Sequence, residues 1–195
     1  MTVGLTVLFV THIIGAPELI GAFVGLVILS SALFLPIWVW ISKRYSKKRA
    51  WSLSLITGSL ILAITPLLSQ GDIIPFAILC TALGATIGCD AIMPTSMLAD
   101  IVYESEKTGD QRRAGLYLAM KNSVSKLSFI APMGLAFPVL DLFGFSTSSV
   151  NTPKSLFMLI FFYALLPTGL RLITFFIVRS MPVLETEKSS ITVTL

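Results

Sequence analysis

Ionised side chains fall inside long apolar stretches of this sequence at four positions: Asp90, Lys121, Lys126 and Arg171. A charge in the bilayer interior costs on the order of 2.5–3.5 kcal/mol, so each is expected to face protein or water. Asp90 lies ten residues before Asp100, and Lys126 lies eleven residues after Gly115. At 1.5 Å per helical residue, both are about 15 to 17 Å deep. Two opposite charges near the midplane could contact a solute or ion, or could only fix helix packing.

Lys121 and Arg171 are predicted to lie nearer the membrane surface. Lys121 is about 9 Å deep by the same rise, and either side chain could extend its flexible stem to the surface. Five residues separate Lys121 from Lys126, which is about 140° around a helix, so both cannot point into one cavity centre. A role in a transport pathway stays open for Lys121 and Arg171 beside the simpler role at the surface.

These charges stand out because the rest of the chain is so apolar. Hydrophobic residues make up 55% of the sequence and charged residues 12%, with a mean hydropathy of +0.89. This composition lies outside the range of soluble domains. Residues 19–41 and 50–71 are runs without an ionised side chain. Because roughly 20 apolar residues cross a membrane as a helix, we predict an all-α integral membrane protein.

Apolar stretches can be placed near residues 1–17, 19–41, 50–70, 73–99, 115–140 and 155–178. We predict that they form one six-helix membrane bundle over residues 1–178, whose first helix is truncated because its stretch is short for a span. Segments 100–113 and 141–154 are predicted to be loops, and residues 179–195 a cytoplasmic tail. The patterns Gly21-x-x-x-Gly25 and Gly84-x-x-x-Gly88 predict close helix packing.

Basic residues are unevenly divided between the two predicted sides of the membrane. When alternate loops are assigned to alternate sides, one side has ten of the 14 lysines and arginines and the other has only Lys154. Cytoplasmic loops carry the basic excess, so the first side is predicted to be cytoplasmic, with both termini inside. Topology then explains the net charge of +4 without a nucleic-acid partner. The ten residues are Lys43, Arg44, Lys47, Lys48, Arg49, Lys107, Arg112, Arg113, Arg179 and Lys188.

Enzyme chemistry finds no support in the residues. The sequence has one histidine, His12, so neither a histidine-based triad nor a histidine metal cluster can be assembled. Phosphate-binding glycine loops and nucleophile elbows are absent from it. Cys80 and Cys89 are nine residues apart, on opposite faces of one predicted helix, which argues against a disulfide or a shared metal site. We therefore predict a protein that is not an enzyme and has no cofactor or metal.

The most specific pattern is residues 97–117, which read MLADIVYESEKTGDQRRAGLY. This segment resembles the loop between the tenth and eleventh helices of the glycoside–pentoside–hexuronide:cation symporters, the melibiose-permease-like branch of the major facilitator superfamily. Residues 36–49 are similar to the family's basic loop after the eighth helix. Residues 137–144 and 165–167 are similar to its last two helices. The likeness covers essentially the whole chain and matches the last six of the family's twelve helices.

The resemblance implies the C-terminal half of a cation-coupled symporter for a sugar or glycoside, working by alternating access in the plasma (inner) membrane. By position, Lys126 matches a lysine that lines the family's sugar and cation cavity, and Asp90 falls where some members also have an intramembrane acid. The coupling ion would be Na⁺ or H⁺, held by acids in an N-terminal half. That six-helix half, or a second subunit, is therefore an expected partner beside the solute, the monovalent cation and the lipid bilayer.

The same resemblance implies a gate at the cytoplasmic face. Asp100, Arg112 and Arg113 match the family's cytoplasmic loop that takes part in this gate. Lys43 and Arg44, in the basic loop after the eighth helix, are expected to join them.

Two other functions stay open on the sequence. A membrane protein can share a transporter's fold without transporting, as a fragment or an interaction module. A transporter of this kind could instead carry a lipid, which would require an apolar opening at the side of the bundle.

Overall fold

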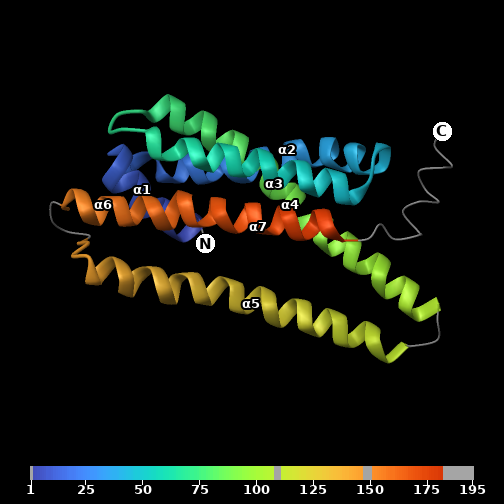
Figure 1. Ribbon diagram of the computed structural model, residues 1–195. Coiled ribbons are helices and arrows are strands. Elements are labelled where there is room, and N and C mark those ends of the chain that lie inside the picture. The colour runs from blue at the N-terminus through green and yellow to red at the C-terminus, as the bar shows by residue number, and fades with distance from the viewer. Residues whose placement is uncertain (1, 108–110, 147–150, 182–195) are drawn as a thin grey trace.

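A computed structural model shows an all-helical chain, as predicted (Figure 1). The structure describes residues 2–107, 111–146 and 151–181. Long helices lie side by side along one direction, and no strand occurs in these ranges. The α-helices are α1 (Thr2–Phe9), α2 (Ile20–Arg44), α3 (Lys47–Ile64), α4 (Ile73–Lys107), α5 (Gln111–Leu142), α6 (Pro153–Ile160) and α7 (Leu166–Ser180).

Short segments of altered winding extend several of these helices. A π-helical segment, Val10–Ile14, continues α1, and a second one, Phe161–Leu165, joins α6 to α7. The second ends two residues before Pro167, a residue that cannot donate a backbone hydrogen bond within the helix. Because α6, this segment and α7 follow one another without a break, they form one rod from residue 153 to residue 180.

Helices of membrane-spanning length and apolarity account for four of the six predicted stretches. Within the described residues they are Pro17–Arg44, Lys47–Leu67, Ile73–Tyr103 and Pro153–Ser180. A shorter apolar helix, Leu5–Ile14, corresponds to the first stretch. The remaining stretch forms α5, whose 32 residues extend about 48 Å.

Helix α4 lies at the centre of the packing. It packs against α2 and α3, and α3 packs in turn against α7. A Cβ on Gly84 would overlap Ser30 of α2, and one on Gly88 would lie 2.7 Å from the carbonyl oxygen of Ser31. The predicted close packing at this pair of glycines is thus confirmed.

The same prediction is wrong for Gly21 and Gly25. Apart from the neighbouring part of α2 itself, no atom of the described chain lies within 4 Å of a Cβ placed on either residue. A spacing of four residues brings two glycines onto one helix face, but it does not say which face meets a neighbour.

Aromatic rings contact one another within the largest apolar core, to which α1, α2, α4, α5, α6 and the second π segment contribute. Phe9 stacks on Tyr163, with their ring centroids 4.2 Å apart, and on Phe76 at 5.6 Å. Phe23 meets Phe76 edge to face at 4.9 Å. Each such pair contributes about 0.5–1.5 kcal/mol beyond its buried area, so this cluster holds the short first helix to the rest of the bundle.

The predicted loop at residues 100–113 is largely helical, which corrects the sequence analysis. Helix α4 continues to Lys107 and α5 begins at Gln111, while residues 108–110 lie outside the described ranges. Residues 100–107 contain neither proline nor glycine, so nothing in them ends a helix. Their polar composition does not end the helix. Figure 1 shows this last part of α4 leading away from the bundle toward the start of α5.

Candidate functional site

The charged site is centred on Asp90 of α4. Its Oδ2 atom lies 2.6 Å from Nη2 of Arg171 on α7. Its Oδ1 atom accepts a hydrogen bond of 2.9 Å from the hydroxyl of Ser54 on α3. Each carboxylate oxygen therefore contacts a side chain of a different helix. The side chains of Arg171 and Asp90 are 17% and 23% exposed, so the pair is mostly but not fully enclosed by the described chain.

Glycine makes the room that the arginine occupies. The guanidinium of Arg171 lies against Gly58 of α3, where an added Cβ would overlap it. The same Cβ would lie 3.0 Å from the hydroxyl oxygen of Thr86 on α4. Arg171 also donates a long hydrogen bond of 3.5 Å from Nη1 to the carbonyl oxygen of Ser54. A small residue at this position thus lets α7 place a cation between α3 and α4.

Ser54 connects the carboxylate to the backbone of α4. Its side chain is completely buried, and its Oγ lies 3.1 Å from the carbonyl oxygen of Thr86 as well as 2.9 Å from Asp90. A hydroxyl has one proton to donate, so these two acceptors share it. The hydroxyl therefore fixes the rotamer of Asp90 relative to its own helix.

This arrangement neutralises two charges at a depth where either alone would be costly. A carboxylate and a guanidinium joined by a short contact form a charge-assisted hydrogen bond, the strongest kind in proteins. Removing one partner would leave an uncompensated charge in a largely apolar setting. The pair therefore ties α7 to α3 and α4, which is the packing role that the sequence left open for Asp90.

Asp90 and Lys126 are not brought together, because the partner of Asp90 is Arg171. Lys126 lies on α5 with an exposed side chain, and Lys121 is partly exposed on the same helix. Neither lysine has an ion-pair partner among the described residues. Asp90 lies within the candidate span Ile73–Tyr103. Its predicted equal depth with Lys126 does not bring the two side chains into contact. The pathway role of Asp90, Lys126, Lys121 and Arg171 stays a prediction.

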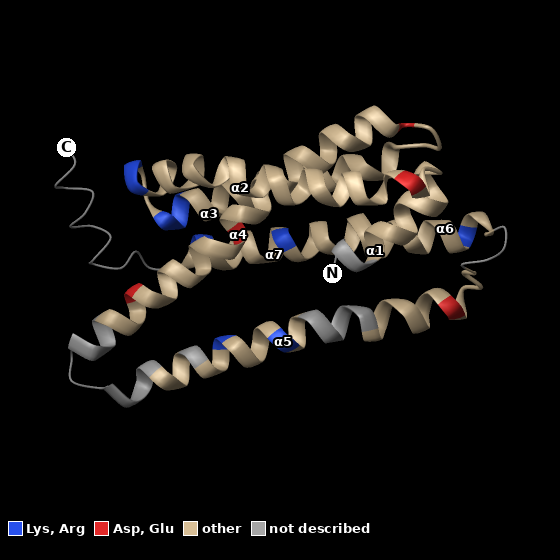
Figure 2. Ribbon diagram, turned by 180° about the vertical axis from the view of Figure 1, so that it is seen from behind, with Lys and Arg blue, Asp and Glu red and all other residues tan. Residues whose placement is uncertain are grey.

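At the predicted cytoplasmic end, Asp100, a residue predicted to belong to a gate, has an ion-pair partner. Lys47, the first residue of α3, lies 2.6 Å from Oδ2 of Asp100. Lys43 and Arg44 end α2 with exposed side chains. Figure 2 shows basic residues gathered around the adjoining ends of α2 and α3.

Arg112 and Arg113 belong to the first turn of α5, but their side chains lie outside the described part of the chain. Their predicted place in the gate therefore stays a prediction.

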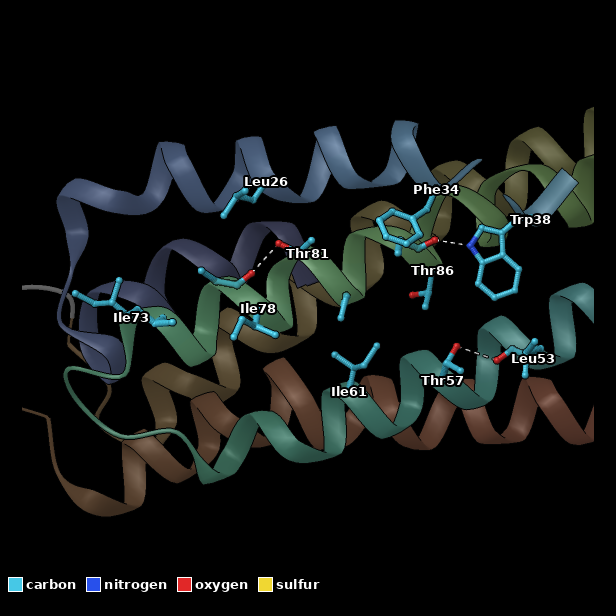
Figure 3. Close-up of a pocket in the computed structure, with 14 residues that line it drawn as sticks. Leu26, Phe34, Trp38, Leu53, Thr57, Ile61, Ile73, Ile78, Thr81 and Thr86 are labelled. Atoms are coloured by element: carbon cyan, nitrogen blue, oxygen red, sulfur yellow. Dashed lines mark hydrogen bonds between the residues drawn. The ribbon is translucent and has the colours of Figure 1, made fainter. Parts of the chain in front are cut away.

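A large groove that the sequence did not reveal runs between α2, α3 and α4 (Figure 3). Its volume is about 740 Å³. Helix α4 lies between the two other helices, which contribute the side walls. The lining residues are Leu26, Phe34, Trp38, Leu53, Thr57, Ile61, Ile73, Ile74, Ala77, Ile78, Thr81, Ala82, Ala85 and Thr86.

The few polar groups of this groove are already hydrogen-bonded. The hydroxyls of Thr57, Thr81 and Thr86 each donate to a carbonyl three or four residues earlier in their own helix, at 2.8–2.9 Å. The indole N–H of Trp38 donates to the carbonyl oxygen of Ala85 at 2.6 Å (Figure 3). The groove therefore presents a hydrocarbon surface, and an apolar occupant fits it best.

Long apolar helices around a paired charge at mid-span are typical of multi-pass membrane transporters. The chain matches the family model described as MFS/sugar transport protein over residues 1–185, and it belongs to this family of transporters. The major facilitator assignment made from residues 97–117 is thereby confirmed.

Curated relatives carry a more particular name, sodium-dependent lysophosphatidylcholine symporter 1. The protein of Gallus gallus is 22% identical over 184 residues, which are 93% of this chain and 35% of the relative. The protein of Homo sapiens is 23% identical over 185 residues, 93% of this chain and 34% of the relative. This chain thus spans about a third of the length of the relatives it matches. No solved structure gives a significant match.

Proposed function

We propose that this chain is the C-terminal part of a cation-coupled symporter that works by alternating access in the plasma (inner) membrane. Family membership and the names of the relatives support this role. Six rods support a six-helix bundle: the extended α1, then α2, α3, α4 and α5, and the joined α6 and α7. In this proposal both termini are cytoplasmic, and the bundle rocks against a second one around a midplane site.

Helix α5 supports the need for a second bundle or subunit. Most of the apolar side chains that the structure describes on α5 are exposed. Leu127, beside Lys126, is 65% exposed. A lysine at mid-span needs water or protein opposite it. An N-terminal half packed opposite α5 would enclose Lys126 in a shared cavity, where it could contact the solute. Na⁺ is the coupling ion favoured by the names of the relatives.

We infer further that the cargo is an amphiphile with an acyl chain, of the lysophospholipid type. The groove between α2, α3 and α4 carries this inference, because it supplies the apolar lateral opening that a lipid cargo requires. From Ile73 to Thr86 it follows α4 for about 20 Å. One leaflet contributes roughly 15 Å of hydrocarbon, so the groove has the length of a lipid tail. A sugar would need free hydrogen-bond donors, and the threonines of this groove already donate their hydroxyl protons within their own helices.

A sugar or glycoside is the second candidate. The signature at residues 97–117 resembles sugar symporters, and the matched family is described by sugar transport. In that case the cargo would bind at the cavity beside Lys126 and not in the groove. In both cases the Lys47–Asp100 pair would close the cytoplasmic side, together with Lys43, Arg44, Arg112 and Arg113 as the family resemblance implies.

Uptake into proteoliposomes by the complete transporter decides between the two cargoes. Ala82→Phe places a ring in the groove and is expected to lower sodium-driven lysophosphatidylcholine uptake about tenfold, a change worth about 1.4 kcal/mol. Ala91→Phe, on an exposed face of α4 outside the groove, is the matched control. Uptake of a glycoside but not of lysophosphatidylcholine would refute the lipid cargo. Unchanged uptake of both cargoes in Lys126→Ala and in Asp90→Ala would remove these residues from the pathway.

A further inference from the structure

A second pocket lies between α3 and α7, at the end of these helices that is predicted to be cytoplasmic. Its volume is about 560 Å³. Cationic side chains come from the first turn of α3 and the last turn of α7, and apolar side chains lie one or two turns deeper on the same helices. The cations are Lys48, Arg49 and Arg179, and the apolar residues are Leu53, Ile56 and Phe175.

The positive charge of this pocket is not balanced by the residues that line it. No acidic side chain is among them. In the part of the chain that the structure describes, neither Arg49 nor Arg179 has an acidic partner, and both side chains are exposed. The neighbouring Lys47, in contrast, is paired with Asp100. Two arginines from different helices therefore present their guanidinium groups at one apolar depression.

We propose that this pocket binds an anionic phospholipid of the adjoining leaflet. The fork of N–H donors on arginine matches phosphate oxygens, so Arg49 and Arg179 would hold the headgroup. Leu53, Ile56 and Phe175 would contact the upper part of an acyl chain. Basic pockets between membrane helices on the cytoplasmic side bind anionic headgroups in this way, and that leaflet carries the anionic lipids.

The lipid would join α3 to α7, the helix that the Asp90–Arg171 pair ties to α4 deeper in the bundle. Arg49 and Arg179 come from α3 and α7, so one phosphate held by both adds a link at the membrane surface. A ligand that binds only the folded arrangement stabilises it by a free energy that rises with the logarithm of its concentration over its Kd. Lipid binding here and thermal stability should therefore rise together. The inference does not depend on which solute the protein carries.

The test uses the complete protein, purified in detergent, with phosphatidylglycerol or with phosphatidylcholine of the same acyl chains. Native mass spectrometry measures the lipid retained, and tryptophan fluorescence follows thermal unfolding. We expect phosphatidylglycerol to be retained and to raise the unfolding temperature, with phosphatidylcholine about tenfold weaker. Arg49→Ala and Arg179→Ala should each weaken phosphatidylglycerol binding about fivefold. The matched control is Arg44→Ala, a basic residue at the same surface outside the pocket, which should change binding less than about twofold.

Equal retention of the two lipids, or an equal loss in Arg44→Ala, would overturn the proposal. Displacement of phosphatidylglycerol by inorganic phosphate at matched concentration would show a small-anion site, and would also overturn the assignment to a lipid. The double variant Arg49→Lys/Arg179→Lys keeps both charges but not the guanidinium forks, and should retain part of the binding, which guards against misfolding of the alanine variants. For the unmodified protein, binding should fall as salt rises from about 0.05 M to about 0.5 M, and binding independent of salt contradicts the proposal.

Discussion

Replacing Asp90 with asparagine tests whether the charge of this side chain, and not only its shape, holds α7 in place. Asparagine keeps an oxygen that can accept the hydrogen bond from Ser54, but it leaves the Arg171 guanidinium without a counter-charge. Removing one partner of a fully buried ion pair costs about 3–5 kcal/mol. Since the two side chains are 17% and 23% exposed, the pair is not fully buried, and we expect a lower cost of about 2–3 kcal/mol.

The double variant Asp90→Asn/Arg171→Gln separates the charge interaction from the two individual losses. Neither charge is then left unpaired, so the double variant should cost about 1–3 kcal/mol less than the sum of the single variants. Ser54→Ala, which removes one hydrogen bond and no charge, should cost about 1 kcal/mol. Chemical unfolding of the purified protein in micelles is followed by tryptophan fluorescence. It gives the change in unfolding free energy for Asp90→Asn, Arg171→Gln, the double variant and Ser54→Ala. Additivity of the single variants to within about 0.5 kcal/mol would refute the reasoning.

Two further substitutions probe the contacts around this site and the groove. Gly58→Ala pushes a methyl group into the Arg171 guanidinium and should destabilise the protein by about 1–3 kcal/mol in thermal unfolding. Gly21→Ala has open space around it and should be neutral or slightly stabilising, and equal effects of the two would contradict the packing argument. Trp38→Phe removes the hydrogen bond from α2 to the carbonyl oxygen of Ala85 and should cost about 1–2 kcal/mol. If amide hydrogen exchange in α2 and α4 is no faster in this variant, that bond does not hold the two helices together.

The class of the protein and most of its helices could be predicted from the sequence. A bilayer demands about 20 apolar residues per span, and this demand is visible in an uninterrupted run such as residues 19–41, which became Ile20–Arg44. The end of α4 could not be located by the same signal. Beyond residue 99 the chain turns polar but keeps good helix formers. Hydropathy therefore indicates the end of the membrane span there, whereas helix propensity indicates that the helix continues.

The candidate site was predicted only in part, for geometrical reasons. The rise per residue gives a depth for Asp90, but it does not give the identity of the neighbouring helix, and so Lys126 was paired with it in place of Arg171. Gly58, which makes room for the guanidinium, is one small residue among many in the sequence. The groove left no signal at all, because apolar lining residues on an apolar span create no periodic contrast.

Helix α5 is attached to the bundle in an uneven way. Among its side chains that the structure describes, only Ala136 and Leu140, near its end, are buried. The helix begins at Gln111, about 44 Å from Leu140 along its axis. A tilt of about 10° around this attachment would move the beginning of the helix by about 8 Å. Such a lever would convert a small change in whatever covers α5 into a displacement at the opposite membrane surface, beside the end of α4 that carries Asp100.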